Sequence, residues 1–227
     1  NVMRTLRTKL EDRSLPYYTP AQDSFNSISH LFGAGLSLIG LAACIHLSIS
    51  EGSMLSLAAS IIYCLSNFLL YSMSGIYHGL KAGMTKKVFQ VLDHCTIYLM
   101  IAGTYTPIIL CGIMPVNPTA AWILMAVEWG MAVLNIILNA IDLKKFKVFA
   151  FISYLVMGWA IVPMYAQVMN ILTVPGFMYI LSGGVVYTVG AALYAAGSKY
   201  SWMHCVFHVC VLIGSILHFF GIFLYVL

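Results

Sequence analysis

Four side chains that can bind a metal ion or activate water are expected to lie at one common depth in a bundle of membrane helices. His204 and His208 are four residues apart, so on a helix they share one face about 6 Å apart, a spacing that can chelate one ion. His78 closes one apolar run and Asp93 lies early in the next. Three neutral imidazoles with a fourth position for water are the arrangement of a catalytic zinc site, and a carboxylate can hold that water. The pattern therefore predicts His78, His204 and His208 as metal ligands, with Asp93 beside the ion.

Other polar residues in the apolar runs have simpler explanations. Ser74 lies one turn before His78 and could support the site as a hydrogen-bond donor, although a helical serine often bonds the carbonyl four residues back. His218 lies about 15 Å deeper than His208, so we expect it to pair with a polar group of the bundle. For Glu128 we expect a protonated, hydrogen-bonded carboxyl, with a proton or substrate contact as the alternative. We expect His30 to lie beside the ligands, His94 to have a packing or gating role, and His46 to lie at the membrane interface.

Membrane-spanning helices must position these residues. The chain is 61% hydrophobic and 8% charged, whereas about a quarter of the residues of a globular domain are charged, so a water-exposed fold is excluded. A spanning helix needs about 20 apolar residues, and the alternation typical of barrel strands is absent. We predict an all-α, seven-helix transmembrane bundle over residues 25–227, preceded by a cytoplasmic N-terminal segment, residues 1–24. Pro107 and Pro163 should kink the third and fifth helices. The seven apolar runs are approximately 25–47, 54–78, 88–112, 119–138, 148–168, 174–196 and 203–226.

All 11 basic residues fall on one side of such a bundle. They occupy the N-terminal segment and the alternate connections 79–87, 139–147 and 197–202. The positive-inside rule then places the N-terminus in the cytoplasm and the C-terminus outside, the reverse of G-protein-coupled receptors. Membrane topology thus explains the net charge of +4 without a nucleic-acid partner. We expect a multi-pass protein of the plasma membrane whose partners are membrane lipids, and no disulfide framework, because all six cysteines lie within the apolar runs.

The motifs around these residues resemble those of the hemolysin III family, the bacterial branch of the progestin and adiponectin receptor family and of the wider alkaline-ceramidase-related membrane hydrolases. The resemblance covers the chain from about Asp23, the acidic position that often precedes the first motif. It implies a cytoplasm-facing zinc held by His78, His204 and His208, with Asp93 near the ion and Ser74 as a supporting donor. The motifs are Asn26-Ser27-Ile28-Ser29-His30, Ser74-Gly75-Ile76-Tyr77-His78, Asp93-His94-Cys95-Thr96-Ile97-Tyr98, Ala102-Gly103-Thr104-Tyr105-Thr106-Pro107, and His204-Cys205-Val206-Phe207-His208 with His218-Phe219.

By this resemblance the chain is expected to be a zinc-dependent, ceramidase-like hydrolase of a lipid amide or related acyl bond that contributes to membrane lipid homeostasis. Zinc would lower the pKa of its bound water toward about 7, Asp93 would take a proton from that water, and Ser74 could donate to the oxyanion. Two other classes remain. One is a non-enzymatic lipid-sensing or receptor-like protein with structural zinc. The other is a pore-forming hemolysin, against which the lack of a polar stripe through the spans argues.

Overall fold

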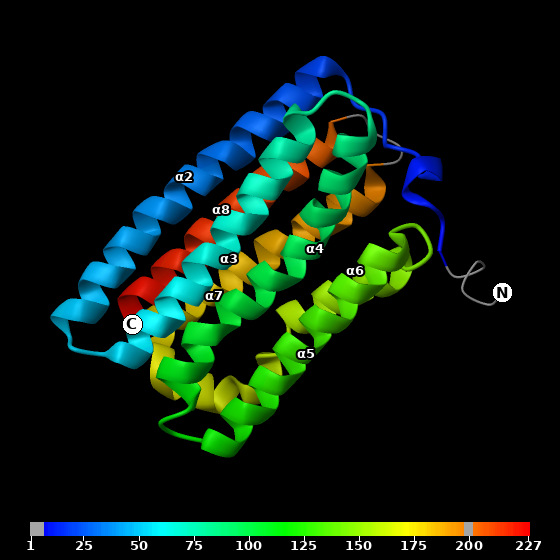
Figure 1. The fold of residues 1–227 in the computed structure, drawn as a ribbon. Helices are drawn as coiled ribbons and strands as arrows, with labels where there is room; N and C mark the ends of the chain where they lie inside the picture. Colours follow the sequence, from blue (N-terminus) through cyan, green and yellow to red (C-terminus); the bar gives the residue numbers. More distant parts are fainter. Residues whose placement is uncertain (1–6, 198–201) are drawn as a thin grey trace.

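The computed structural model describes residues 7–197 and 202–227, which form an elongated bundle of helices (Figure 1). No strand occurs within these two ranges. The prediction of an all-α membrane protein is confirmed, and all six cysteines are free. In chain order the elements are the 3-10 helix η1 (Leu10–Asp12), α2 (Pro20–Ser50), α3 (Met54–Gly79), α4 (Met84–Pro107), the π-helix η2 (Ile108–Ile113), α5 (Pro118–Asp142), α6 (Lys147–Gly158), the 3-10 helix η3 (Val162–Met164), α7 (Tyr165–Ala196) and α8 (Met203–Tyr225).

Six helical segments among the described residues are long and apolar enough to cross a membrane. Five of these segments correspond to the first four and the last of the apolar runs in the sequence. The remaining segment, Lys147–Ala195, covers the fifth and sixth runs together. A straight helix of its 49 residues would be about 74 Å long, more than twice the thickness of a bilayer's hydrocarbon core. The chain is not straight there, because α7 is kinked at Thr173, which has a φ of 59°, just before Pro175.

Hydrogen bonds and close packing show the path of this segment. The Tyr98 and Tyr105 hydroxyls of α4 donate to the carbonyls of Ala150 and Gly158, so α6 runs parallel to α4. After the kink, α7 packs antiparallel to α8. Gly176 lies against Tyr225, near the end of α8. Further along α7, Gly183 lies against His218 and Gly190 against Cys210, each nearer the start of α8. The chain therefore runs down the bundle in α6 and returns in α7, as Figure 1 shows.

The two prolines expected to kink helices behave differently. The expectation of a helix over 148–168 bent at Pro163 is wrong, because α6 ends at Gly158 and Pro163 lies in η3. Proline lacks the N–H needed inside a helix but fits the first turn of a new one. Pro107 does disturb its helix, because α4 gives way there to the π-helix η2.

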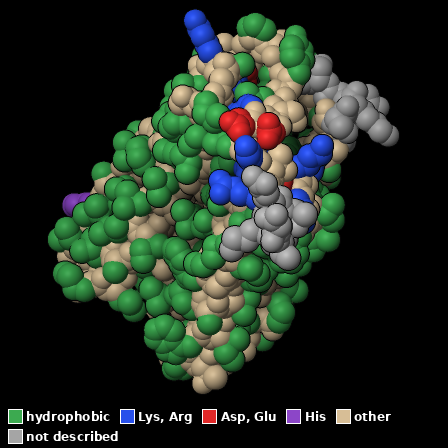
Figure 2. Space-filling model, turned by 45° about the vertical axis from the view of Figure 1, so that its right-hand side comes forward, with side chains coloured by type: hydrophobic (Ala, Val, Ile, Leu, Met, Phe, Trp, Pro, Cys, Tyr) green, Lys and Arg blue, Asp and Glu red, His purple; other side chains and the backbone are tan. Residues whose placement is uncertain are grey.

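One end of the bundle gathers most of the charged residues. The Arg13 guanidinium donates to the carbonyls of Ala140 and Ile141 at the end of α5, and the Lys87 ammonium donates to the Glu11 carbonyl. The segment before α2 and two of the basic connections therefore lie together, as the charge pattern predicts, and Figure 2 shows this charged region on an otherwise largely apolar surface. Two of the basic residues lie outside the described residues, Arg4 and Lys199.

The opposite end of the bundle is packed mainly with apolar side chains. A cluster there brings together the far ends of α2, η2 and α8 and the start of α7. Its members with 0 or 1% exposure include Cys44, Ile113, Val168, Leu172 and Ile222. This packing joins the helices at the end of the bundle away from the charged residues.

Candidate metal centre

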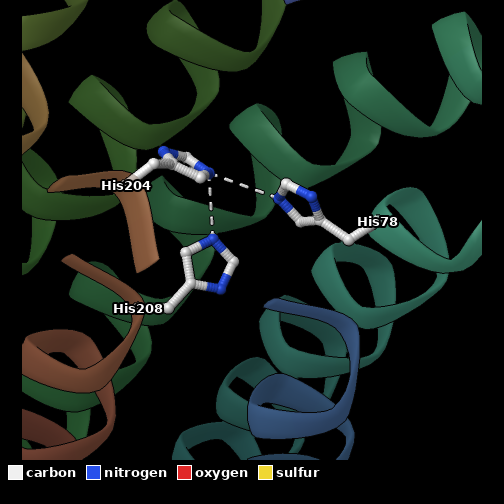
Figure 3. Close-up of side chains that lie close together, drawn as sticks. All are labelled: His78, His204 and His208. Atoms are coloured by element: carbon white, nitrogen blue, oxygen red, sulfur yellow. Dashed lines mark hydrogen bonds between the residues drawn. The ribbon is translucent and has the colours of Figure 1, made fainter. Parts of the chain in front are cut away.

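Three histidine side chains converge where α3 meets α8 (Figure 3). His78 lies in the last turn of α3, and His204 and His208 lie one turn apart at the start of α8. The Nε2 atom of His204 lies 3.3 Å from Nε2 of His78 and 3.1 Å from Nε2 of His208. His78 and His208 are each 2% exposed. The structure thus brings together the three residues that the sequence analysis proposed as ligands.

The donor set fits a metal ion better than it fits hydrogen bonds among the rings. His204 Nε2 faces two other Nε2 atoms, but a neutral imidazole nitrogen is either one donor or one acceptor, so only one of the two contacts can be a hydrogen bond. A cation that accepts all the lone pairs removes this conflict. In a tetrahedral zinc site with Zn–N distances of about 2.0–2.1 Å, the ligand nitrogens lie about 3.3 Å apart, close to both observed distances.

Asp23, in the first turn of α2, orients one of these histidines. Its Oδ1 lies 2.8 Å from His78 Nδ1, and its Oδ2 accepts a 2.7 Å hydrogen bond from the Lys86 ammonium. A carboxylate can only accept, so His78 carries its proton on Nδ1 and keeps a lone pair on Nε2, toward the other rings. Carboxylates commonly hold metal-binding histidines in this way. From the sequence, Asp23 is recognisable only as a motif position, and no pattern there indicates this contact.

Asp93 and Ser74 line the same cavity as His204 and His208. The cavity measures about 570 Å³, within the range of pockets that hold small ligands. The Ser74 side chain makes no hydrogen bond with any described residue, so its hydroxyl is not used by the carbonyl one turn back. Asp93 does not belong to the group of ligand atoms within 4.8 Å of one another. Asp93 therefore fits a position beside a bound ion and not that of a direct ligand. Apolar side chains form much of the wall, among them Leu70, Ile97, Ile101, Phe207 and Val211.

The remaining histidines have distinct surroundings. His30 stacks on His208 with ring centroids 3.8 Å apart, so it lies beside the candidate ligands as expected. His94 Nδ1 lies 2.8 Å from the Gln90 carbonyl and 3.6 Å from Asp93 Oδ2. His218 donates from Nε2 to the Ile180 carbonyl, which confirms the expected polar partner in the bundle. His46 is exposed on α2.

Glu128 does not meet its expectation of a hydrogen-bonded carboxyl. Its side chain is 0% exposed in α5, and neither carboxylate oxygen has a hydrogen-bond partner within the described part of the chain. The residue does not line the cavity with Asp93 and the histidines. The structure therefore separates Glu128 from the candidate centre.

Tyr18 is the second residue that the sequence analysis missed. Its ring stacks on His204 at a centroid distance of 4.9 Å and meets His78 edge-on at 5.3 Å. Burial raises the pKa of the Tyr18 phenol, and the nearby Asp93 and Asp23 carboxylates contribute to the rise, so the phenol stays protonated. Thr19 and Pro20 mark the start of α2, but no sequence pattern indicates that the aromatic ring before them covers the histidines.

Comparison with known proteins supports the motif resemblance. A family model described as haemolysin-III related matches residues 18–219. The chain belongs to the hemolysin III family. It is 35% identical over 202 residues to Hemolysin-3 of Bacillus cereus, covering 89% of this chain and 90% of that protein. It is 32% identical over 212 residues to the Hemolysin-3 homolog of Bacillus subtilis strain 168, covering 92% and 96%.

The hemolysin III match spans the whole candidate centre. It begins at Tyr18 and includes Asp23, His78 and both histidines of α8. The N-terminal residues that orient and cover the histidines therefore belong to the family's common region, although they precede the first apolar run read from the sequence.

Proposed function

We propose that this hemolysin III family protein is a zinc-dependent membrane hydrolase that cleaves a lipid amide or related acyl bond and contributes to membrane lipid homeostasis. The observation that carries the proposal is the shared cavity. It combines the imidazoles of His204 and His208 with the Asp93 carboxylate and the free Ser74 hydroxyl on one largely apolar wall. An acyl chain can lie along such a wall while its polar bond lies near the histidines.

In this mechanism His78, His204 and His208 hold the ion, and Asp23 fixes the tautomer of His78. When bound, zinc polarises a carbonyl and makes water more acidic. Asp93 takes a proton from the attacking water on a carboxylate oxygen and later passes it to the leaving amine or alcohol. Ser74 donates to the carbonyl oxygen as negative charge develops there. The apolar wall limits the access of bulk water to these groups.

The proposal includes seven membrane crossings, with the N-terminus in the cytoplasm and the C-terminus outside, in the plasma membrane. The descent in α6 and return in α7 supply the two crossings within Lys147–Ala195. α6 alone, with 12 residues, is about 18 Å long, so the fifth crossing also uses η3 and the start of α7. The basic residues at the histidine end support the orientation.

A lytic pore is the function that the relatives' name Hemolysin-3 suggests. A pore needs a polar path through the whole bundle. The cavity extends from the charged end to the middle, near Tyr105 and His218, and the apolar cluster fills the other end. This packing favours a hydrolase over a pore.

Metal content measured beside lipid turnover tests the proposal. We expect about one zinc per chain in protein purified without chelator, and chelator-sensitive release of fatty acid from a panel of lipid amides and esters. Zinc without turnover of any lipid in the panel would favour a structural ion in a receptor-like protein. Near-zero zinc in the unmutated protein, equal to that of His204→Ala, would reject the metal centre.

A further inference from the structure

The Tyr18 hydroxyl is a polar group in the cavity that the protein leaves unused. The ring touches His204 of α8 and His78 of α3. Tyr18 lines the cavity together with Asp93 and Ser74. Within the described ranges, its hydroxyl makes no hydrogen bond. A phenol that faces a cavity without a partner has a donor available for a ligand.

A second tyrosine of the cavity differs from Tyr18 in how accessible its oxygen is. Tyr77 also lines the cavity, and its hydroxyl also has no partner among the described residues, but that oxygen is completely enclosed. The Tyr18 oxygen is not among the enclosed, unpartnered atoms. Of these two phenols, Tyr18 is thus the one whose oxygen a ligand can reach without a rearrangement.

The chain on both sides of Tyr18 is anchored. Upstream, Arg13 donates to the carbonyls at the end of α5. Downstream, Thr19 and Gln22 form a capping box, in which the Gln22 N–H donates to the Thr19 hydroxyl and the Thr19 N–H donates to the Gln22 side chain. A donor held in place before the substrate binds loses little entropy when it is used, which is what an oxyanion-stabilising group requires.

We propose that the Tyr18 phenol donates a hydrogen bond to the carbonyl oxygen of the bond that is cleaved and stabilises the negative charge that develops there. This inference rests on the proposed hydrolase function and adds a residue from outside the helices to it. Its ligand class is an acyl group whose carbonyl becomes a tetrahedral oxyanion. Because the hydroxyl and not the ring supplies the effect, Tyr18→Phe should remove it while keeping the contact with His204.

The test compares Tyr18→Phe with Tyr17→Phe, a matched control that removes the same atom from a neighbouring residue that is 88% exposed. The probe is dodecylphosphonate, whose tetrahedral anionic head resembles the oxyanion, and its binding to zinc-loaded protein is measured by calorimetry. We expect Tyr18→Phe to bind the probe about 10-fold more weakly, the effect of about one hydrogen bond. Zinc content should equal that of the unmutated protein, and Tyr17→Phe should bind normally.

Two results would overturn the proposal in different ways. Equal affinity of Tyr18→Phe and unmutated protein, with lipid turnover intact in both, would reduce Tyr18 to a ring that covers the histidines and leave the hydrolase function standing. If the unmutated protein neither binds the phosphonate nor hydrolyses any lipid, the hydrolase function fails and the role of Tyr18 fails with it. In an active enzyme, Tyr18→Phe should lower kcat and leave KM unchanged, because the oxyanion is absent from the bound substrate and forms only as the reaction proceeds.

Discussion

Replacing Asp23 by asparagine should weaken metal binding without removing any ligand. The carboxylate lies 2.8 Å from His78 Nδ1 and also accepts a hydrogen bond from Lys86, whose side chain is buried. Asparagine has nearly the same size as aspartate, and its amide oxygen could still accept from Nδ1. The substitution therefore removes the negative charge that makes His78 a stronger electron donor to the ion, and it also leaves the buried Lys86 ammonium facing an amide NH2 group in place of an acceptor.

The size of the effect follows from this geometry. Removing the outer partner of a metal-binding histidine typically weakens metal binding about 10- to 100-fold, or about 1.4–2.7 kcal/mol. Because asparagine keeps the hydrogen-bond acceptor, we expect Asp23→Asn near the lower limit and Asp23→Ala near the upper one. The measurement is the zinc dissociation constant of detergent-solubilised protein, obtained by competition with a chromogenic chelator.

Glu11→Gln is the control, because it removes one negative charge from an exposed side chain at the same end of the bundle. It should leave the zinc dissociation constant unchanged. If Asp23→Asn binds zinc as tightly as the unmutated protein, His78 is not oriented by Asp23 in the way that the structure indicates. If both variants weaken binding equally, the effect reflects overall charge and not the contact.

Three further predictions concern catalysis, packing and topology. Asp93→Asn should keep most of the zinc but lower lipid hydrolysis at least about 100-fold, the scale of general acid–base catalysis. His208→Ala should lose both zinc and activity. Full complementation of a deletion strain by Asp93→Asn would contradict the mechanism. Glu128→Leu should raise the free energy of unfolding by about 1–3 kcal/mol, because a buried carboxyl without partners is replaced by an apolar side chain, and a lower melting temperature would show that the carboxyl has a stabilising partner. Reporter fusions at residue 1 and after Leu227 should report opposite compartments, and finding both on one side would reject seven crossings.

Local features of the sequence were enough to predict most of the helices. Long apolar runs exclude a soluble fold, since their side chains have no other favourable environment, and the runs near 54–78 and 203–226 match α3 and α8 almost to the residue. The spacing of His204 and His208 follows from helical periodicity alone. The expected helix over 148–168 failed because an apolar run does not reveal where a helix stops, and α6 ends at Gly158 within that run.

Only the tertiary structure decided how the centre is assembled. His78 and His204 are 126 residues apart, and depth in the membrane predicted a common level but not the 3.3 Å approach, which depends on how α3 packs beside α8. Asp23 and Tyr18 reach His78 from 55 and 60 residues away, and no periodicity connects them to it. Sequence patterns report which face and depth a residue occupies because those depend on neighbours along one helix. The partners of a side chain depend on the relative rotation of separate helices, and that is settled only when the whole bundle packs.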